Sequence, residues 1–128
     1  MKKIAIISLS NLIQDPRVFR QIDALKQDYK IITAGLTSSG IPEIPFFQLE
    51  FFGKKIYQRS LCMKLTKNYE NFYWNYGNLQ ELGQYLRKEE PDIIIANDID
   101  MLPVAIQNKG YAKVIFDAHE YSPLENDE

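Results

Sequence analysis

Short, almost unbroken apolar runs alternate along this sequence with longer segments in which apolar residues recur at every third or fourth position. The short runs predict strands at Ile4–Leu9, Tyr29–Ala34, Pro45–Phe52, Asp92–Ala96 and Lys113–Phe116. Runs that are apolar at consecutive positions are typical of strands with both faces covered, as in a parallel sheet. The pattern therefore predicts a sheet with helices packed on both sides.

Two helices are predicted before Gly77. The first begins at Asp15-Pro16, where aspartate can cap the helix and proline suits its first position, and it covers about residues 16–27. A second helix is predicted within residues 57–76, because bulky aromatic and leucine side chains recur there about every four positions.

Two further helices are predicted from capping signals. Asn78 stands three residues before Glu81, a spacing that resembles a capping box, and leucines follow at helical spacing. Asp100 is expected to cap a short helix that Gly110 ends. Helices and strands thus alternate along most of the chain.

This alternation predicts a three-layer α/β sandwich of Rossmann-like form with right-handed crossovers. We expect residues 1–128 to form a single domain with a mostly parallel five-stranded sheet in the order 3-2-1-4-5. In that order the chain reverses direction between the first and fourth strands, and ligands bind at the carboxyl ends of the strands beside this switch. Three loops, residues 8–15, 97–98 and 117–120, should therefore share one mouth.

Composition excludes several kinds of site. The 15 basic and 17 acidic residues give a net charge of −2, so nothing suggests nucleic acid as a partner. The single cysteine, Cys62, excludes an internal disulfide and a cysteine-cluster zinc site, and the single histidine, His119, excludes a two-histidine metal site. The glycines form neither a G-x-G-x-x-G fingerprint nor a P-loop. We expect no cofactor and no metal.

No targeting or membrane-spanning segment is predicted. The apolar run that begins at Ile4 stops at Ser8, which is too short for a secretory signal. No stretch approaches the roughly 18 consecutive apolar residues that cross a bilayer. A lone cysteine also fits a reducing compartment, so a cytoplasmic location is expected.

Three segments lead into the predicted mouth. They are Asp15-Pro16-Arg17-Val18, the strand at 91–96 followed by Asn97-Asp98, and the strand at 114–116 followed by Asp-Ala-His-Glu at 117–120. In this order they resemble the amino-terminal half of group 1 (family four-like) glycosyltransferases, which have the two-domain GT-B architecture. The Asp-Ala-His-Glu segment is the most specific of the three.

The resemblance implies transfer of a sugar from a nucleoside-diphosphate donor to a hydroxyl acceptor, in the synthesis of a cell-surface polysaccharide or glycolipid. In such enzymes the amino-terminal domain carries most acceptor contacts, and the carboxyl-terminal domain binds the donor nucleotide. The second domain has no counterpart in these 128 residues. We therefore expect an acceptor-side fragment of a longer enzyme, inactive by itself.

The resemblance also gives the segment after the fifth strand a role. It implies that His119 lines the donor-sugar side of the cleft, where it binds the sugar and stabilises the transition state. Glu120 and Asp117 either orient His119 through hydrogen bonds or cap the turn, and Glu120 is counted among the substrate-binding candidates.

Four more candidates border the ends of the first and fourth strands. Asp98 is expected near the acceptor hydroxyl as a catalytic residue, with Asn97 beside it, and the alternative is that both cap the following helix. Asn11 and Arg17 border the first loop, where the amino-terminal dipole of the first helix favours an anionic group such as phosphate. The glycine-rich loop of many relatives is missing there.

The alternative function is a free-standing flavodoxin-like binding or regulatory module. A receiver domain is excluded, because Ser8-Leu9-Ser10 stands where an acidic cluster is needed and Asp-Ala-His-Glu stands where a lysine is needed. A flavin site needs a phosphate loop rich in hydroxyls and glycine after the first strand. Only Ser8 and Ser10 are available for such a loop.

Charge is segregated at residues 51–69, which hold five basic side chains and no acidic one. Together with Phe51, Phe52 and Tyr57 they suggest a surface that contacts anionic lipid, where each basic residue contributes about 1 kcal/mol. The alternative is that the aromatic stripe belongs to the core and the basic residues are its solvated edge.

Sedimentation with liposomes separates these alternatives. If residues 51–69 contact lipid, more protein should sediment with anionic vesicles than with neutral ones at low salt, and added salt should reverse the difference. Equal recovery with both kinds of vesicle at low salt would eliminate the lipid surface.

Overall fold

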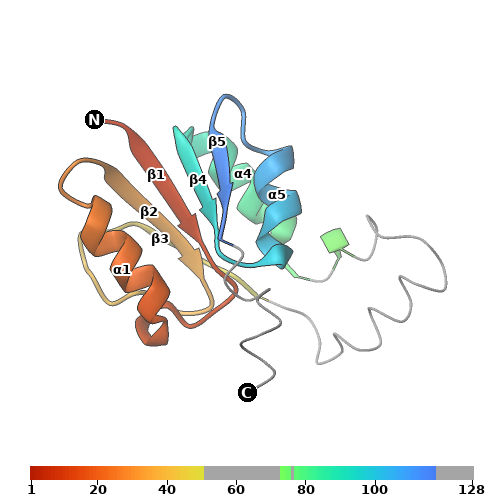
Figure 1. The fold of residues 1–128 in the computed structure, drawn as a ribbon. Helices are drawn as coiled ribbons and strands as arrows, with labels where there is room; N and C mark the ends of the chain where they lie inside the picture. Colours follow the sequence, from red (N-terminus) through yellow and green to blue (C-terminus); the bar gives the residue numbers. More distant parts are fainter. Residues whose placement is uncertain (51–72, 76, 118–128) are drawn as a thin grey trace, which may run out of the picture.

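Five parallel strands in the order β3-β2-β1-β4-β5 form the centre of the structure (Figure 1). In this computed structural model, residues 1–50, 73–75 and 77–117 are described. The strands are β1 (Lys3–Ile7), β2 (Lys30–Gly35), β3 (Phe46–Gln48), β4 (Ile93–Ala96) and β5 (Lys113–Phe116). The predicted α/β fold and the strand order 3-2-1-4-5 are confirmed, and every pairing is parallel.

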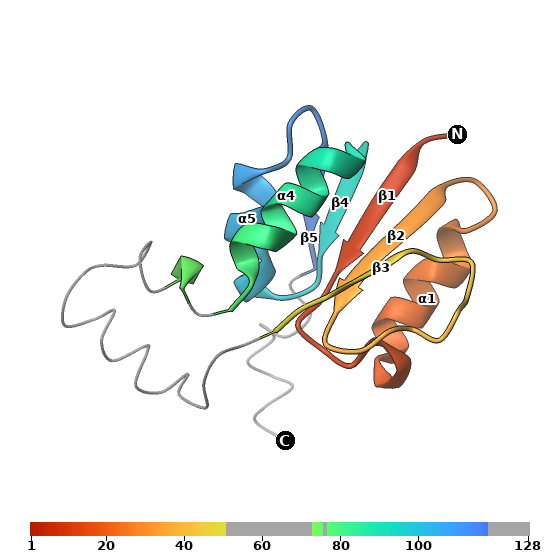
Figure 2. The ribbon, with the colours of Figure 1, turned by 180° about the vertical axis from the view of Figure 1, so that it is seen from behind.

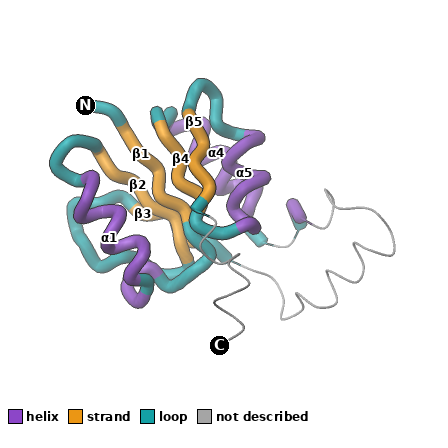
Figure 3. Tube along the Cα trace, viewed as in Figure 1, coloured by secondary structure: helices purple, strands orange, loops and turns teal. Residues whose placement is uncertain are grey.

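Helices cover the sheet on both faces. The described helices are α1 (Pro16–Leu25), α4 (Leu79–Glu89), α5 (Leu102–Gln107) and the 3-10 turns η1 (Leu12–Gln14) and η2 (Ile99–Met101). One face is packed by α1, and the other by α4 and α5 (Figures 2 and 3). Among the described segments, no helix has the length and apolar character needed to cross a membrane.

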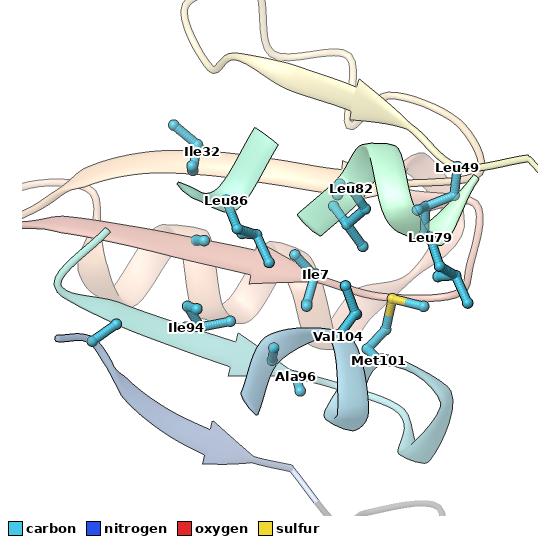
Figure 4. Close-up of a cluster of buried hydrophobic side chains, with 14 of the residues drawn as sticks. Ile7, Ile32, Leu49, Leu79, Leu82, Leu86, Ile94, Ala96, Met101 and Val104 are labelled. Carbon is cyan, nitrogen blue, oxygen red and sulfur yellow. The ribbon is translucent and has the colours of Figure 1, made fainter. Parts of the chain in front are cut away.

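Alternate residues of the strands supply the two cores. Ala5 pairs in register with Ile32 and Ile94, and all three face α4 and α5. The leucines of α4 fill this side, and Leu82 and Leu86 are completely buried (Figure 4). Burial of one such side chain contributes about 1.5–3 kcal/mol, so this face of the sheet depends on α4.

The opposite core is built by the other set of alternate residues. Ile4 and Ile6 of β1 meet Val18 and Ile22 of α1, and all four are essentially buried. Asp15 caps α1 as predicted, because its side chain accepts a hydrogen bond from the Arg17 N–H at 3.0 Å. The helix therefore starts at a fixed point beside the end of β1.

Several predicted boundaries change. The first helix ends at Leu25, and the third strand covers Phe46–Gln48 of the predicted 45–52, of which 51–52 lie outside the described residues. Pro45 has no N–H to donate, so the ladder between β2 and β3 begins where its carbonyl accepts from Thr33. The predicted helix at 57–76 lies almost entirely outside the described residues.

The predicted capping box at Asn78 is wrong. Asn78 occupies the position before α4, but its side chain makes no cap hydrogen bond. Its Nδ2 donates to the Gln48 carbonyl at 2.9 Å and its Oδ1 accepts from the Glu50 N–H at 2.8 Å. The side chain is used to link the end of β3 to the start of α4.

The predicted cap at Asp100 is also wrong. Asp100 lies inside the 3-10 turn η2, and the residue before α5 is Met101. The carbonyl of Asp100 accepts a hydrogen bond from the Tyr73 hydroxyl. The turn therefore continues directly into α5 without a separate capping residue.

Gly35 permits the close approach of η1 to the end of β2. A Cβ atom at Gly35 would lie 2.5 Å from Cγ of Leu12, whose side chain is completely buried. It would also lie 3.0 Å from the Ser10 carbonyl oxygen. Neither neighbour has room to move, so η1 and the loop after β1 require glycine here.

Gly35→Ala should lower the free energy of unfolding by about 1–3 kcal/mol, measured by urea denaturation, because the added methyl overpacks this contact. Leu12→Ala removes the clashing atoms but leaves a cavity, so it also destabilises. The double variant should lose clearly less stability than the two single losses added together. Additive losses would show that Gly35 and Leu12 do not compete for this space.

Candidate functional site

A group of polar side chains lies at the carboxyl ends of β1 and β4. It contains Ser8, Ser10, Asp15, Arg17, Gln21, Asn97, Asp98 and Asp117, named here the polar cluster. Ser8 and Asn97 are completely buried, and Asp15 and Asp98 are each 7% exposed. The chain leaves β1 and β4 in opposite directions at this point, so the cluster lies at the topological switch (Figure 1).

The loop after β1 folds back so that its serines meet the start of α1. The Ser8 N–H still bonds to the Ala34 carbonyl at 3.0 Å, which extends the sheet by one residue. The chain then turns through η1, and the Ser10 hydroxyl donates to Asp15 Oδ2 at 2.7 Å. Asp15 therefore caps α1 with one oxygen and receives Ser10 with the other.

The Arg17 guanidinium contacts three residues in two parts of the chain. Its Nε and Nη2 donate to the two carboxylate oxygens of Asp15 at 3.3 and 3.1 Å. Its Nη1 donates to the Asn97 carbonyl at 3.1 Å, and Nη2 lies 3.8 Å from Asp98 Oδ1. A planar guanidinium can make all these contacts at once, so Arg17 joins α1 to the end of β4.

The Asp98 carboxylate is oriented by the loop after β1. Its Oδ2 accepts from the Ser8 hydroxyl at 3.1 Å and from the Leu9 N–H. Asp98 stands at the capping position of η2, but its side chain does not cap that turn. The helix-capping alternative therefore does not describe this side chain. Its Oδ1 lies 3.8 Å from Arg17 Nη2.

A reciprocal amide pair extends the cluster toward β5. Gln21 Nε2 donates to Asn97 Oδ1 at 2.7 Å, and Asn97 Nδ2 donates to Gln21 Oε1 at 3.0 Å. Gln21 Nε2 also lies 3.4 Å from Asp117 Oδ2, just after β5. Gln21 stands one helical turn after Arg17, so both side chains lie on the same side of α1.

The cluster shifts the pKa values of its central pair. Burial raises the pKa of Asp15, but hydrogen bonds from Arg17 and Ser10 and the positive charge of Arg17 outweigh it, so the pKa lies below its ordinary value. The hydrogen bond to Asp15 raises the pKa of Arg17 against the opposing effect of burial, and the charges of Asp15, Asp98 and Asp117 add to the rise. Both groups are therefore charged at neutral pH.

Charge in the cluster is predominantly negative, since three carboxylates share one guanidinium. Carboxylates and amide carbonyls accept hydrogen bonds from hydroxyl groups, whereas they repel phosphate. Within residues 1–50, 73–75 and 77–117, no group of three or more histidine, cysteine or acidic side chains could hold a metal ion. The carboxylates of the cluster therefore favour contact with a hydroxyl group over contact with a phosphate.

Three of the six candidate site residues meet in this cluster: Arg17, Asn97 and Asp98. Asn11 is exposed at the start of η1, and its side chain makes no cap hydrogen bond. His119 and Glu120 lie outside the described residues. The strand order therefore predicted that the ends of β1 and β4 meet, but Gln21 had no predicted site role, and Ser8 and Ser10 were considered only for a flavin loop.

No family model matches this chain, and a search of curated proteins found no match either. Function is therefore argued from the residues of the polar cluster.

Asp15→Asn tests the charge at the centre of the cluster. Asparagine is as good a capping residue as aspartate, so the variant keeps the cap. The free energy of unfolding should fall by about 1–3 kcal/mol at pH 7, because the charge of the carboxylate and its bonds with Arg17 and Ser10 are lost. The folded pKa of Asp15 is below the unfolded value near 3.8, so this stabilisation is complete above that pH. It is lost as the pH falls through the folded pKa.

Urea denaturation of the unchanged protein and of Asp15→Asn at several pH values measures the difference in their free energies of unfolding. It should be constant near neutral pH and shrink below about pH 4. Asp23→Asn is the control, because Asp23 lies on the same helix with a side chain that is 70% exposed. A difference that stays undiminished in strong acid would contradict the role of the carboxylate.

Proposed function

We propose that this chain is the acceptor-side lobe of a GT-B glycosyltransferase, which transfers a sugar from a nucleoside-diphosphate donor to a hydroxyl acceptor. The acceptor belongs to the synthesis of a cell-surface polysaccharide or glycolipid, and a second lobe binds the donor nucleotide. The observation that carries the proposal is the buried polar cluster at the switch between β1 and β4.

The charge of the cluster supports an acceptor rather than a nucleotide at this mouth. An acceptor sugar offers hydroxyl groups, and the Asp98 carboxylate is the proposed acceptor of a hydrogen bond from one of them. A diphosphate would meet the negative field of the carboxylates, so its natural place is the facing lobe. Division of the two ligands between two lobes is what the proposed reaction requires.

Asp98 is proposed to contact the acceptor hydroxyl. Oδ2 of Asp98 is occupied by Ser8 and the Leu9 N–H, which leaves Oδ1 as the oxygen for the acceptor. A carboxylate held in this way can accept the hydroxyl proton as the new glycosidic bond forms. Asp98 is 7% exposed, so an acceptor hydroxyl would have to meet the small part of this residue that reaches the surface.

Arg17 is proposed to position the site. Its contacts with Asp15 and the Asn97 carbonyl use most of its donors, which favours this role over phosphate binding. Asn97 is held by Gln21 in the same way. Asn11, exposed on the first loop, is proposed to contact the acceptor.

His119 and Glu120 complete the proposed site through the resemblance alone. In this proposal His119 binds the donor sugar and stabilises the transition state, and Glu120 binds substrate beside it. The protein is proposed to act in the cytoplasm at the inner face of the membrane, with residues 51–69 as the membrane contact and no nucleic-acid partner.

The flavodoxin-like alternative is less well supported by the loop after β1. A flavin phosphate would need the hydroxyls of Ser8 and Ser10 as donors. Those hydroxyls already donate to Asp98 and Asp15, whose negative charges would face the phosphate. This loop therefore favours a sugar hydroxyl over a phosphate.

Titration followed by amide NMR tests the proposal on the 128-residue chain. Methyl glycosides of common hexoses should shift the amide signals of Ser8, Leu9 and Asp98, with dissociation constants on the order of millimolar. Uridine diphosphate should leave these signals unchanged.

Asp98→Asn should abolish the response to glycosides, because the amide replaces one acceptor oxygen by a donor. Asp28→Asn is the matched control, since Asp28 is exposed in the turn after α1, at the other end of the sheet. Shifts produced by the diphosphate and not by any glycoside would reverse the assignment of the two ligands.

A further inference from the structure

A cavity with a volume of about 430 Å³ opens at the amino-terminal edge of the sheet, away from the polar cluster. It lies between the last turn of α1, the first residues of β2 and the segment 41–45 that leads into β3. Figure 2 shows this connection beside α1. The polar cluster lies at the opposite ends of the strands, so the two sites share no residue. The volume is within the usual range for small-molecule sites.

The cavity exists because β3 is short. Pairing between β2 and β3 begins at Thr33, whose N–H donates to the Pro45 carbonyl at 2.9 Å. Residues two apart on a parallel strand direct their backbone groups to the same side, so the N–H and C=O of Ile31 also face away from β1. At that level β3 has not begun, and the edge of β2 borders the cavity.

The walls of the cavity are apolar. Ile22 of α1 and Ile31 of β2 form its floor, with exposures of 0% and 7%. Ile41 and Ile44 line the side that belongs to the connection between β2 and β3, and both remain half-buried. A hydrocarbon group placed here would contact branched aliphatic side chains on two sides.

Charge at the rim is positive overall. Lys3 and Glu89 neutralise each other, because Lys3 Nζ lies 3.0 Å from Glu89 Oε1. Lys26 and Lys30 then face a single acid, Glu43. Lys26 Nζ also lies 3.4 Å from Asp23 Oδ1. Both side chains are more than half exposed, so the attraction between these two charges is weak. The rim thus has an excess of one positive charge.

We propose that this cavity binds a small amphipathic carboxylate, with its hydrocarbon chain against the isoleucines and its carboxylate at Lys30 and Lys26. The apolar walls would contact the hydrocarbon chain of the ligand. The residues that line the cavity carry one more positive than negative charge, which favours a negatively charged headgroup. The backbone N–H of Ile31, at the open edge of β2, is a further donor for the carboxylate. This binding site is independent of the proposed sugar transfer.

Decanoate, used below its micellar concentration, is the probe for a titration followed by amide NMR. It should shift the amide signals of Lys30, Ile31, Ile41 and Ile44 and leave those of Ser8 and Asp98 unchanged. Decanol and decyltrimethylammonium have the same chain without the negative charge. Both should bind at least about tenfold more weakly than decanoate.

Lys26→Glu/Lys30→Glu reverses the rim charge on two exposed residues. It should weaken decanoate at least about tenfold and bring decyltrimethylammonium to the same cavity. Lys109→Glu, at an exposed lysine outside the cavity, is the control and should leave decanoate binding unchanged. Decanoate shifts that map elsewhere, equal binding of decanol, or an equal effect of the control would each overturn the proposal.

Discussion

The contact between the Arg17 guanidinium and the Asp15 carboxylate is the central interaction of the polar cluster. Carboxylates are stable in a buried site only when they are paired and hydrogen-bonded, and Asp15 and Asp98 are both buried. Arg17 satisfies Asp15 directly, approaches Asp98, and reaches the carbonyl of Asn97. Without it, two negative charges would lie close together at the ends of adjacent strands.

The Arg17 side chain also links the loops that follow the two halves of the sheet, because it bonds to the Asn97 carbonyl after β4. Asp15 and Arg17 belong to the start of α1, which leads to β2, whereas Asn97 and Asp98 follow β4. Parallel strands bring their carboxyl ends to the same edge, but they do not by themselves orient the side chains found there. The guanidinium and the loop after β1 supply that orientation, and in the proposed function Asp98 Oδ1 is the oxygen that meets the ligand.

Much of the fold could be predicted from the sequence, because apolar runs and helix starts are local signals. Asp15-Pro16 marked the beginning of α1 correctly, since an N-cap bond involves residues two positions apart. The similar local pattern at Asn78 predicted a capping box, and this prediction is wrong. The Asn78 amide bonds instead to the backbone of Gln48 and Glu50, about thirty residues earlier. Local capping patterns are overridden when a distant backbone offers a better partner.

The interior of the site was less predictable for the same reason. Ser8 and Asp98 are 90 positions apart, and the local sequence around either residue does not predict their contact. The spacing of Gln21, one helical turn after Arg17, indicates that the two side chains lie on the same side of α1. It indicates a contact with Asn97 only when α1 is known to pass beside the end of β4. Strand order identified the mouth, whereas the hydrogen bonds within it depend on packing across the sheet.

A crystal structure of the chain with a methyl glycoside is the most direct measurement of whether this mouth receives an acceptor sugar. The proposal predicts a sugar hydroxyl within about 3 Å of Asp98 Oδ1, with the ring beside Asn97 and Asp117. A glycoside bound elsewhere, or a mouth filled by the protein's own side chains with no space for a sugar, would contradict it.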